Sequence, residues 1–190
     1  MFKNGELLFS VENGPDANPM LQFYRQLKVE YPKFHKMDAL CKLGWLAAEV
    51  AMTNHKHDQT DPNCAVVLSN KTSSIRSDHT FNESLESFPS PAVFVYTLPS
   101  IVLGEICIRH RLQGENLFVI FEKFNAAALL SLVQQSARFG EATTFLTGWL
   151  DCSLDTFEAV LFYGTINGEG IPFNEENLQK IYRSKNGITS

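Results

Sequence analysis

The chain has 190 residues, of which 44% are hydrophobic and 19% are charged, and its 16 basic and 21 acidic side chains give a net charge of -5. This apolar content excludes a disordered chain and is enough to bury a core, so we expect a single domain over residues 1–190. The acidic balance argues against a dedicated nucleic-acid binder, which usually carries a basic surface.

The sequence also predicts the cellular location of the protein. Glu105 and Arg109 interrupt the most apolar stretch, which begins at Phe94, so no membrane span is predicted. The opening Met-Phe-Lys-Asn-Gly-Glu lacks the layout of a secretory signal. The four cysteines form no Cys-x-x-Cys pair, and we therefore expect neither a disulfide framework nor a zinc site, but a reducing, cytoplasmic location.

The first half of the chain predicts strands that alternate with helices. Asp38 begins the clearest helix, in which two apolar stripes indicate burial on two sides. The run 65–68 is continuously apolar and is typical of a central strand covered on both faces. The other elements expected here are a strand at 7–11, a helix at 19–29 that the Tyr31-Pro32 step ends, a polar loop at 55–63 and a short helix at 77–85.

The second half predicts three more strands. The expected elements are an irregular segment at 88–91, a helix at 93–108 broken near Pro99 and closed by the basic residues and glycine of 109–114, a buried-type strand at 117–121, a helix at 126–138 capped by Asn125, an antiparallel strand pair at 143–150 and 157–163, and a surface helix at 175–183. Together these elements predict an α/β fold of three layers: a mixed five-stranded sheet with helices on both faces and one antiparallel edge strand.

Two segments contain residue types that bind ligands elsewhere. His55, His57 and Asp58 lie in the polar loop, with Asp61 and Cys64 after them, which leaves a metal-binding module open as an alternative. The set mixes hard and soft ligands, and polar loops carry His and Asp for solubility alone, so no metal is expected. The glycine-rich stretch 164–170 lacks the Gly-Lys-Ser/Thr ending of a phosphate loop. We expect no cofactor.

The stretch from Leu98 to Asp151 carries a family resemblance. Gly104-Glu-Ile-Cys-Ile-Arg109, followed by Leu112-Gln-Gly-Glu-Asn116, resembles the segment that precedes the active-site strand in the β-ketoacyl synthase family, with Glu115 in place of the family's proline. Gly140-Glu-Ala-Thr-Thr-Phe-Leu-Thr-Gly-Trp149 is similar to the strand that follows the nucleophile helix. The resemblance implies the amino-terminal half of a thiolase-like fold.

The catalytic motif of that family is changed in this chain. The family's nucleophilic cysteine lies nine residues after Gly114, where this sequence has Lys123, beside Glu122 and before Asn125. Acyl transfer from a thioester requires a thiolate, and a lysine that attacked would form a stable amide. The family's histidine pair lies in its second half, to which no residue here corresponds. The resemblance therefore implies that no catalytic residue is present.

The resemblance to one half of a ketosynthase, without the nucleophile, implies that the protein acts as a partner subunit. The family's chain-length-factor subunits also lack the cysteine and pair with an active ketosynthase, so we expect a full-length ketosynthase or a second copy as partner, in fatty-acid, polyketide or aryl-polyene-type synthesis. The resemblance implies that Leu117, Val119 and Phe121 belong to the strand that pairs in the dimer. The alternative is that this segment is an interior strand of the single chain. Acyl carrier protein is the second implied partner, and the basic residues offered to it are Arg109, His110 and Arg111; the same charges would also suit a helix C-terminus.

Two further expectations concern the remaining Cys and His residues. An acyltransferase that uses Cys107 or Cys152 as an unrecognised nucleophile is an alternative function. The five histidines, which include His55 and His110, are interpreted as surface or capping residues because none lies in a nucleophile motif.

Overall fold

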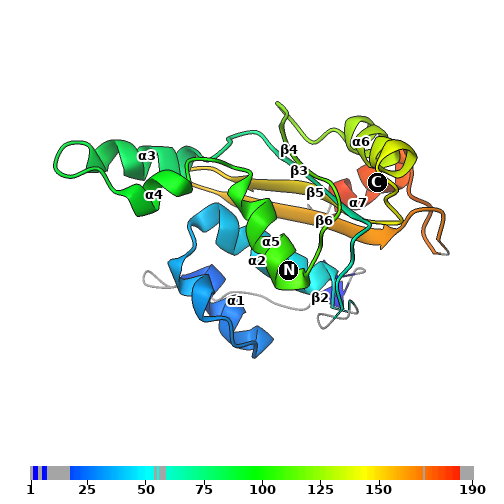
Figure 1. Ribbon diagram of the computed structural model, residues 1–190, viewed down its shortest axis with the longest axis horizontal. Helices are drawn as coiled ribbons and strands as arrows, with labels where there is room; N and C mark the ends of the chain where they lie inside the picture. Colours follow the sequence, from blue (N-terminus) through cyan, green and yellow to red (C-terminus); the bar gives the residue numbers. More distant parts are fainter. Residues whose placement is uncertain are drawn as a thin grey trace.

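The computed structural model describes residues 2–3, 6–7, 18–53, 55, 59–168 and 170–184. Its main sheet has four strands in the order β4-β3-β5-β6, and a separate two-stranded sheet pairs β1 with β2. Figure 1 shows helices on both sides of the main sheet, so the three-layer expectation is confirmed. The strands are β1 (Phe2–Lys3), β2 (Glu6–Leu7), β3 (Cys64–Asn70), β4 (Asn116–Ile120), β5 (Thr144–Cys152) and β6 (Phe157–Thr165).

The expectation of five strands in one sheet is wrong for the described residues. The first expected strand, 7–11, is described only at Leu7, which pairs with Phe2 in the small sheet, and residues 8–11 lie outside the described part. In the main sheet β3 runs parallel to β4 and β5, and β6 is antiparallel to β5. The predicted antiparallel edge is therefore confirmed.

The helices divide between the two faces. The first face carries α1 (Pro19–Leu27), the 3-10 helix η1 (Pro32–Lys36), α2 (Ala39–Ala51) and α5 (Ile101–His110); the second carries α6 (Ala126–Phe139) and α7 (Glu175–Ser184); and α3 (Ile75–Ser84) and α4 (Pro91–Val95) project beyond one end of the sheet (Figure 1). No helix in the described part of the chain is long and apolar enough to cross a membrane.

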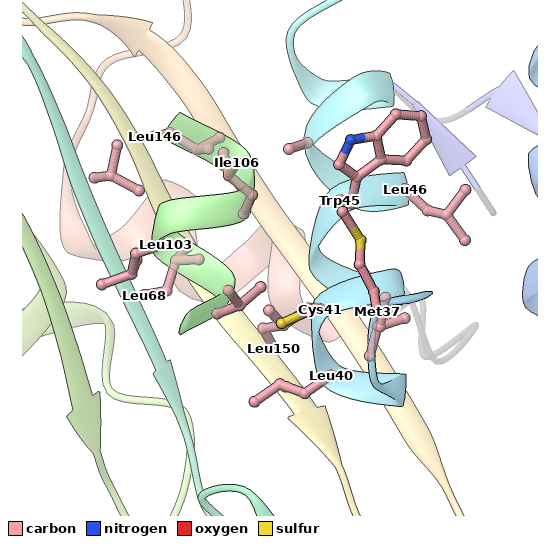
Figure 2. Packing of buried hydrophobic residues seen from close by; sticks show 14 of the residues in the cluster. Met37, Leu40, Cys41, Trp45, Leu46, Leu68, Leu103, Ile106, Leu146 and Leu150 are labelled. Atoms are coloured by element: carbon pink, nitrogen blue, oxygen red, sulfur yellow. The ribbon is translucent and has the colours of Figure 1, made fainter. Parts of the chain in front are cut away.

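Helix α2 is the centre of the first face because nearly all of its residues are buried. Asp38 begins it by accepting a hydrogen bond from the Cys41 amide, a normal N-cap arrangement. Figure 2 shows Cys41 on the side of α2 that faces α5, and Leu46 on the opposite side. At Gly44 an added Cβ would lie 2.3 Å from Val102 Cγ2, so glycine is what allows α2 to approach α5 closely. The two apolar stripes of the sequence are therefore both buried, as predicted.

Several local signals differ from the expectation in detail. The 88–91 segment is irregular only to Ser90, because Pro91 occupies the first turn of α4, where proline is well tolerated. The helix expected at 93–108 is two helices with Pro99 between them. Arg111 rather than Gly114 adopts the left-handed conformation after α5. Asn125 caps α6 as predicted.

Strand β4 is an edge strand and is not buried. Three of its residues are exposed and the other two, Phe118 and Val119, are half-buried, whereas every residue of β3 is buried. Leu117 and Ile120 are 42% and 48% exposed. The sequence expectation of a buried-type strand, and of an interior one, is wrong for the single chain, because β4 pairs with β3 alone.

Candidate functional site

The carboxyl ends of β3 and β4 form the topological switch point of the sheet. In register, Asn70 at the end of β3 lies opposite Ile120 at the end of β4. After β3 the chain continues through α3 and α4 to α5 on the first face, whereas after β4 it enters α6 on the second face. In open α/β sheets, the crevice between strands whose connections leave to opposite faces is the usual place for ligands. The candidate site is therefore made of 70–73 and 121–125.

The loop after β3 is held by two side chains. Asn70 is fully buried; its Nδ2 donates to the Ser73 carbonyl at 2.8 Å, and its Oδ1 accepts from the Ser73 amide at 3.0 Å. Asp151, at the end of β5, accepts on one oxygen from the Lys71 amide, the Thr72 amide and the Thr72 hydroxyl, at 3.0, 2.9 and 2.8 Å. These contacts fix the β3 side of the crevice.

The β4 side carries Lys123, the residue that the sequence comparison places at the nucleophile position. Glu122 and Lys123 are both exposed in the turn between β4 and α6. Neighbouring Phe124 is buried and stacks on Tyr182 of α7, with ring centroids 4.1 Å apart. Asn125 accepts a hydrogen bond from the Ala128 amide at 3.0 Å. The turn is therefore anchored by Phe124 and Asn125, and Lys123 extends from it without an ion pair to any described residue.

The cysteines do not supply an alternative nucleophile at this edge. Burial raises the pKa of the Cys107 and Cys152 thiols to about 11 and that of Cys64 to about 12. Burial, together with the charge of Asp38, also raises the pKa of Cys41. At neutral pH only about one in 10⁴ of a thiol with a pKa near 11 is thiolate, and the thiolate is the reactive form. The thiols of the described cysteines are therefore almost entirely protonated at neutral pH.

The predicted basic group of α5 is mostly withdrawn from the surface. Arg109 Nε lies 2.5 Å from Glu49 Oε1, and its guanidinium lies over the rings of Tyr31 and Trp45. The bond to Glu49 raises the pKa of Arg109. His110 is fully buried, which makes the surface interpretation of this histidine wrong, and only Arg111 is exposed. A carrier-protein contact through these residues stays a prediction, with Arg111 as its accessible charge.

Of the proposed metal ligands, the structure describes His55, Asp61 and Cys64. His55 contacts the Tyr163 hydroxyl through Nδ1 at 3.2 Å and the His110 carbonyl through Nε2 at 3.0 Å, so both ring nitrogens have protein partners. His57 and Asp58 lie outside the described residues. Within the described ranges no three His, Cys, Asp or Glu side chains gather closely enough to hold a metal ion.

Comparison with known proteins gives matches among solved structures only. No family model and no curated protein matches this chain. A structure described as "The ishigamide ketosynthase/chain length factor" matches with a TM-score of 0.54 and 21% identity, over 66% of this chain and 37% of that chain. A structure of the ketosynthase ApeO in complex with its chain length factor ApeC, from Xenorhabdus doucetiae, matches with a TM-score of 0.48 and 14% identity, over 66% of this chain and 52% of that chain.

The fold is of the ketosynthase type. At 21% identity the first match establishes the fold alone, and this chain spans well under half of the matched chain's length. The mixed sheet with helices on both faces agrees with the thiolase-like fold that the sequence resemblance implied.

Sequence reasoning missed the two side chains that shape the crevice. Neither Asp151 nor Asn70 belongs to a motif that the sequence patterns single out. A local signal existed for Asn70, because asparagine hydrogen-bonds to backbone groups in turns. No local signal existed for Asp151, whose partners Lys71 and Thr72 lie about 80 residues earlier in the chain.

Proposed function

We propose that this chain is a non-catalytic, ketosynthase-fold partner subunit that pairs along β4 with a full-length ketosynthase or with a second copy of itself. The observation that carries the proposal is the open edge of β4. It combines backbone groups that no described strand pairs with and exposed apolar side chains, and an edge of that kind favours pairing with another strand.

The backbone register identifies which groups are open. The Glu115 carbonyl accepts from Val66, and the Phe121 amide donates to Asn70, so the odd-numbered residues of this segment bond to β3. Alternate residues of a strand point to opposite sides, which leaves the amides and carbonyls of Asn116, Phe118 and Ile120 directed to the open edge. The side chains of Ile120 and Leu117 are exposed on the two faces of the same edge. A partner strand would gain backbone bonds and apolar contact together.

The chemistry at the switch point supports a role without condensation. Lys123 stands where the family resemblance places the nucleophile, and attack by its amine on a thioester would end in an amide that cannot be transferred further. The buried, protonated thiols disfavour an acyltransferase that uses Cys107 or Cys152. The ishigamide structure is described as a ketosynthase/chain length factor, and a paired subunit of that kind is the role proposed here.

The pairing is tested by changing the edge without changing the core. Ile120→Lys is expected to convert a pairing subunit into a monomer, because an edge lysine must lose hydration when a second strand docks. The wild-type chain, alone and mixed with a purified full-length ketosynthase, is measured by sedimentation velocity. Ile171→Lys is the matched control, since Ile171 is 74% exposed and lies away from β4, and it should pair as the wild type does.

The pairing proposal is abandoned if the wild-type chain sediments as a monomer in both conditions, or if Ile120→Lys pairs as well as Ile171→Lys. Equal melting temperatures of the two variants would confirm that any loss of pairing does not reflect unfolding, because both side chains are already exposed in the single chain.

The absence of condensing chemistry is tested by mass spectrometry after incubation with an acyl-carrier thioester. No cysteine should carry an acyl group after a time in which an active ketosynthase is fully acylated, because less than about 0.1% of each thiol is ionised at neutral pH. Cys107→Ser, at the least buried thiol, should give the same spectrum as the wild type. Stoichiometric acylation that Cys107→Ser removes would establish the acyltransferase alternative instead.

A further inference from the structure

A cleft of about 370 Å³ separates the start of α2 from the projecting α3–α4 pair. None of its lining residues belongs to β4 or to the turn that carries Lys123. Figure 1 shows α3 and α4 beyond one end of the sheet. Met37, Ala39, Val93 and Tyr96 supply apolar wall. Small-molecule sites usually have volumes of about 300–1,000 Å³, so this cleft is at the small end of that range.

Two cations line the cleft without a carboxylate partner. Lys36 and Arg76 form no ion pair with any described residue. Arg76 donates through Nε to the Ser153 carbonyl and through one terminal nitrogen to the Leu154 carbonyl, so backbone oxygens fix its position but do not neutralise its charge. The cleft therefore offers one positioned guanidinium and one adjustable ammonium.

The single acidic group of the lining is already occupied. Asp38 Oδ1 accepts from the Cys41 amide at 2.9 Å, and Oδ2 accepts from the Ser77 hydroxyl at 2.6 Å. The carboxylate also faces the positive end of the α2 dipole, which reduces its effect on an approaching anion.

Tyr96 adds a hydroxyl at the base of the cleft. Burial and the charge of Glu105 raise the pKa of Tyr96, so its phenol stays protonated and can donate a hydrogen bond. Glu105 is itself held by Lys33, with 2.8 Å between Nζ and Oε2. Besides the engaged Asp38 carboxylate, the polar groups of the lining are two cations and several hydroxyls, which can interact with an anionic acceptor.

We propose that this cleft binds a small amphipathic carboxylate, whose apolar body lies against Met37, Val93 and Tyr96 and whose carboxylate faces Lys36 and Arg76. This site is separate from the pairing edge and does not depend on the proposed function. The ligand class is a compact aromatic or branched aliphatic acid, because the walls are apolar and the volume limits its size.

The test uses naphthoate as the probe and isothermal titration calorimetry of the full chain as the measurement. Naphthoate should bind and the neutral amide, naphthamide, should bind at least ten-fold more weakly, because the amide offers no charge to the two cations. Lys36→Gln should weaken naphthoate binding about five-fold, an effect that grows at low salt. Lys180→Gln is the matched control, since this lysine lies on α7 at the other face, and it should leave binding unchanged.

Ala92→Trp keeps both cations and fills the cleft, because Ala92 is an exposed residue of its lining. It should abolish naphthoate binding while the melting temperature stays that of the wild type. Absence of binding to the wild-type chain up to about 10 mM probe overturns the proposal, and so does unchanged binding by Ala92→Trp. Ile120→Lys should still bind naphthoate, so failure of the pairing and failure of this site are separate results.

Discussion

Replacing Gly148 by alanine is expected to lower the free energy of unfolding by about 3–5 kcal/mol, most of the stability of an ordinary domain. Gly148 lies in the middle of β5, with a φ of +152° that residues with a side chain rarely adopt. An added Cβ would lie 2.1 Å from the carbonyl oxygen of Val160 in β6. That oxygen belongs to the backbone of a paired strand, so the clash is relieved only by separating β5 from β6.

The same substitution at Gly104 is the control. Gly104 lies on the exposed side of α5, and nothing lies within 4 Å of its added Cβ. Gly104→Ala should raise stability by about 0.5–1 kcal/mol, because alanine loses less backbone entropy than glycine in a helix. Urea denaturation of both variants followed by circular dichroism measures the difference. A Gly148→Ala protein within about 1 kcal/mol of the wild type would contradict the strand geometry.

The elements that the sequence predicted well are those with strong local signals. Helix α2 has an aspartate that caps it and two apolar stripes that are buried in the core, both as expected. Asn125 and Gly140 mark the two ends of α6, since capping depends on residues within one turn of the helix. The β5–β6 pair followed from the short turn between two apolar runs, which allows only an antiparallel connection.

The predictions that proved wrong concern which other elements a strand or helix packs against. An apolar run predicts a strand but not its place in the sheet, and β4 was expected to be buried although only one strand pairs with it. His110 looked like part of a charged helix end, yet it is buried behind the Arg109–Glu49 pair, which joins residues 60 positions apart. Burial of such a residue depends on tertiary contacts, which no local pattern contains.

The candidate site also has one part that local sequence patterns predicted and one part that depends on tertiary contacts. The residue spacing of the family motif was sufficient to predict that Lys123 lies in the turn before α6. In the structure, that turn lies at the switch point of the sheet. The contacts of Asp151 with the loop after β3 join residues about 80 positions apart, and they required the fold. A rigid β3 loop beside an exposed lysine is a suitable scaffold for binding, and it lacks the ionised thiol that acyl transfer needs.

Stability is expected to be nearly constant from pH 7 to about pH 8.5 and to fall steeply above pH 9. All four thiols have a raised pKa in the folded chain, near 11 for Cys107 and Cys152. The unfolded thiols ionise first, near pH 9, so the stabilising difference is fully present below that pH and is lost as the pH rises toward the folded values. At pH 10 each thiol accounts for a loss of about 1.4 kcal/mol, and the four together for about 5.6 kcal/mol.

Urea denaturation at intervals from pH 7 to pH 10.5 measures this loss, and Cys107→Ala separates the contribution of one thiol. The variant should lose about 1.4 kcal/mol less than the wild type between pH 7 and pH 10, because its alanine cannot ionise in either state. Lys33 and Tyr96 have raised pKa values as well, so their effects have the same sign but begin only above about pH 10. Equal losses in the two proteins would mean that Cys107 ionises as readily in the folded chain as in the unfolded one. Its thiolate would then be available at neutral pH, and the acyltransferase alternative would regain its nucleophile.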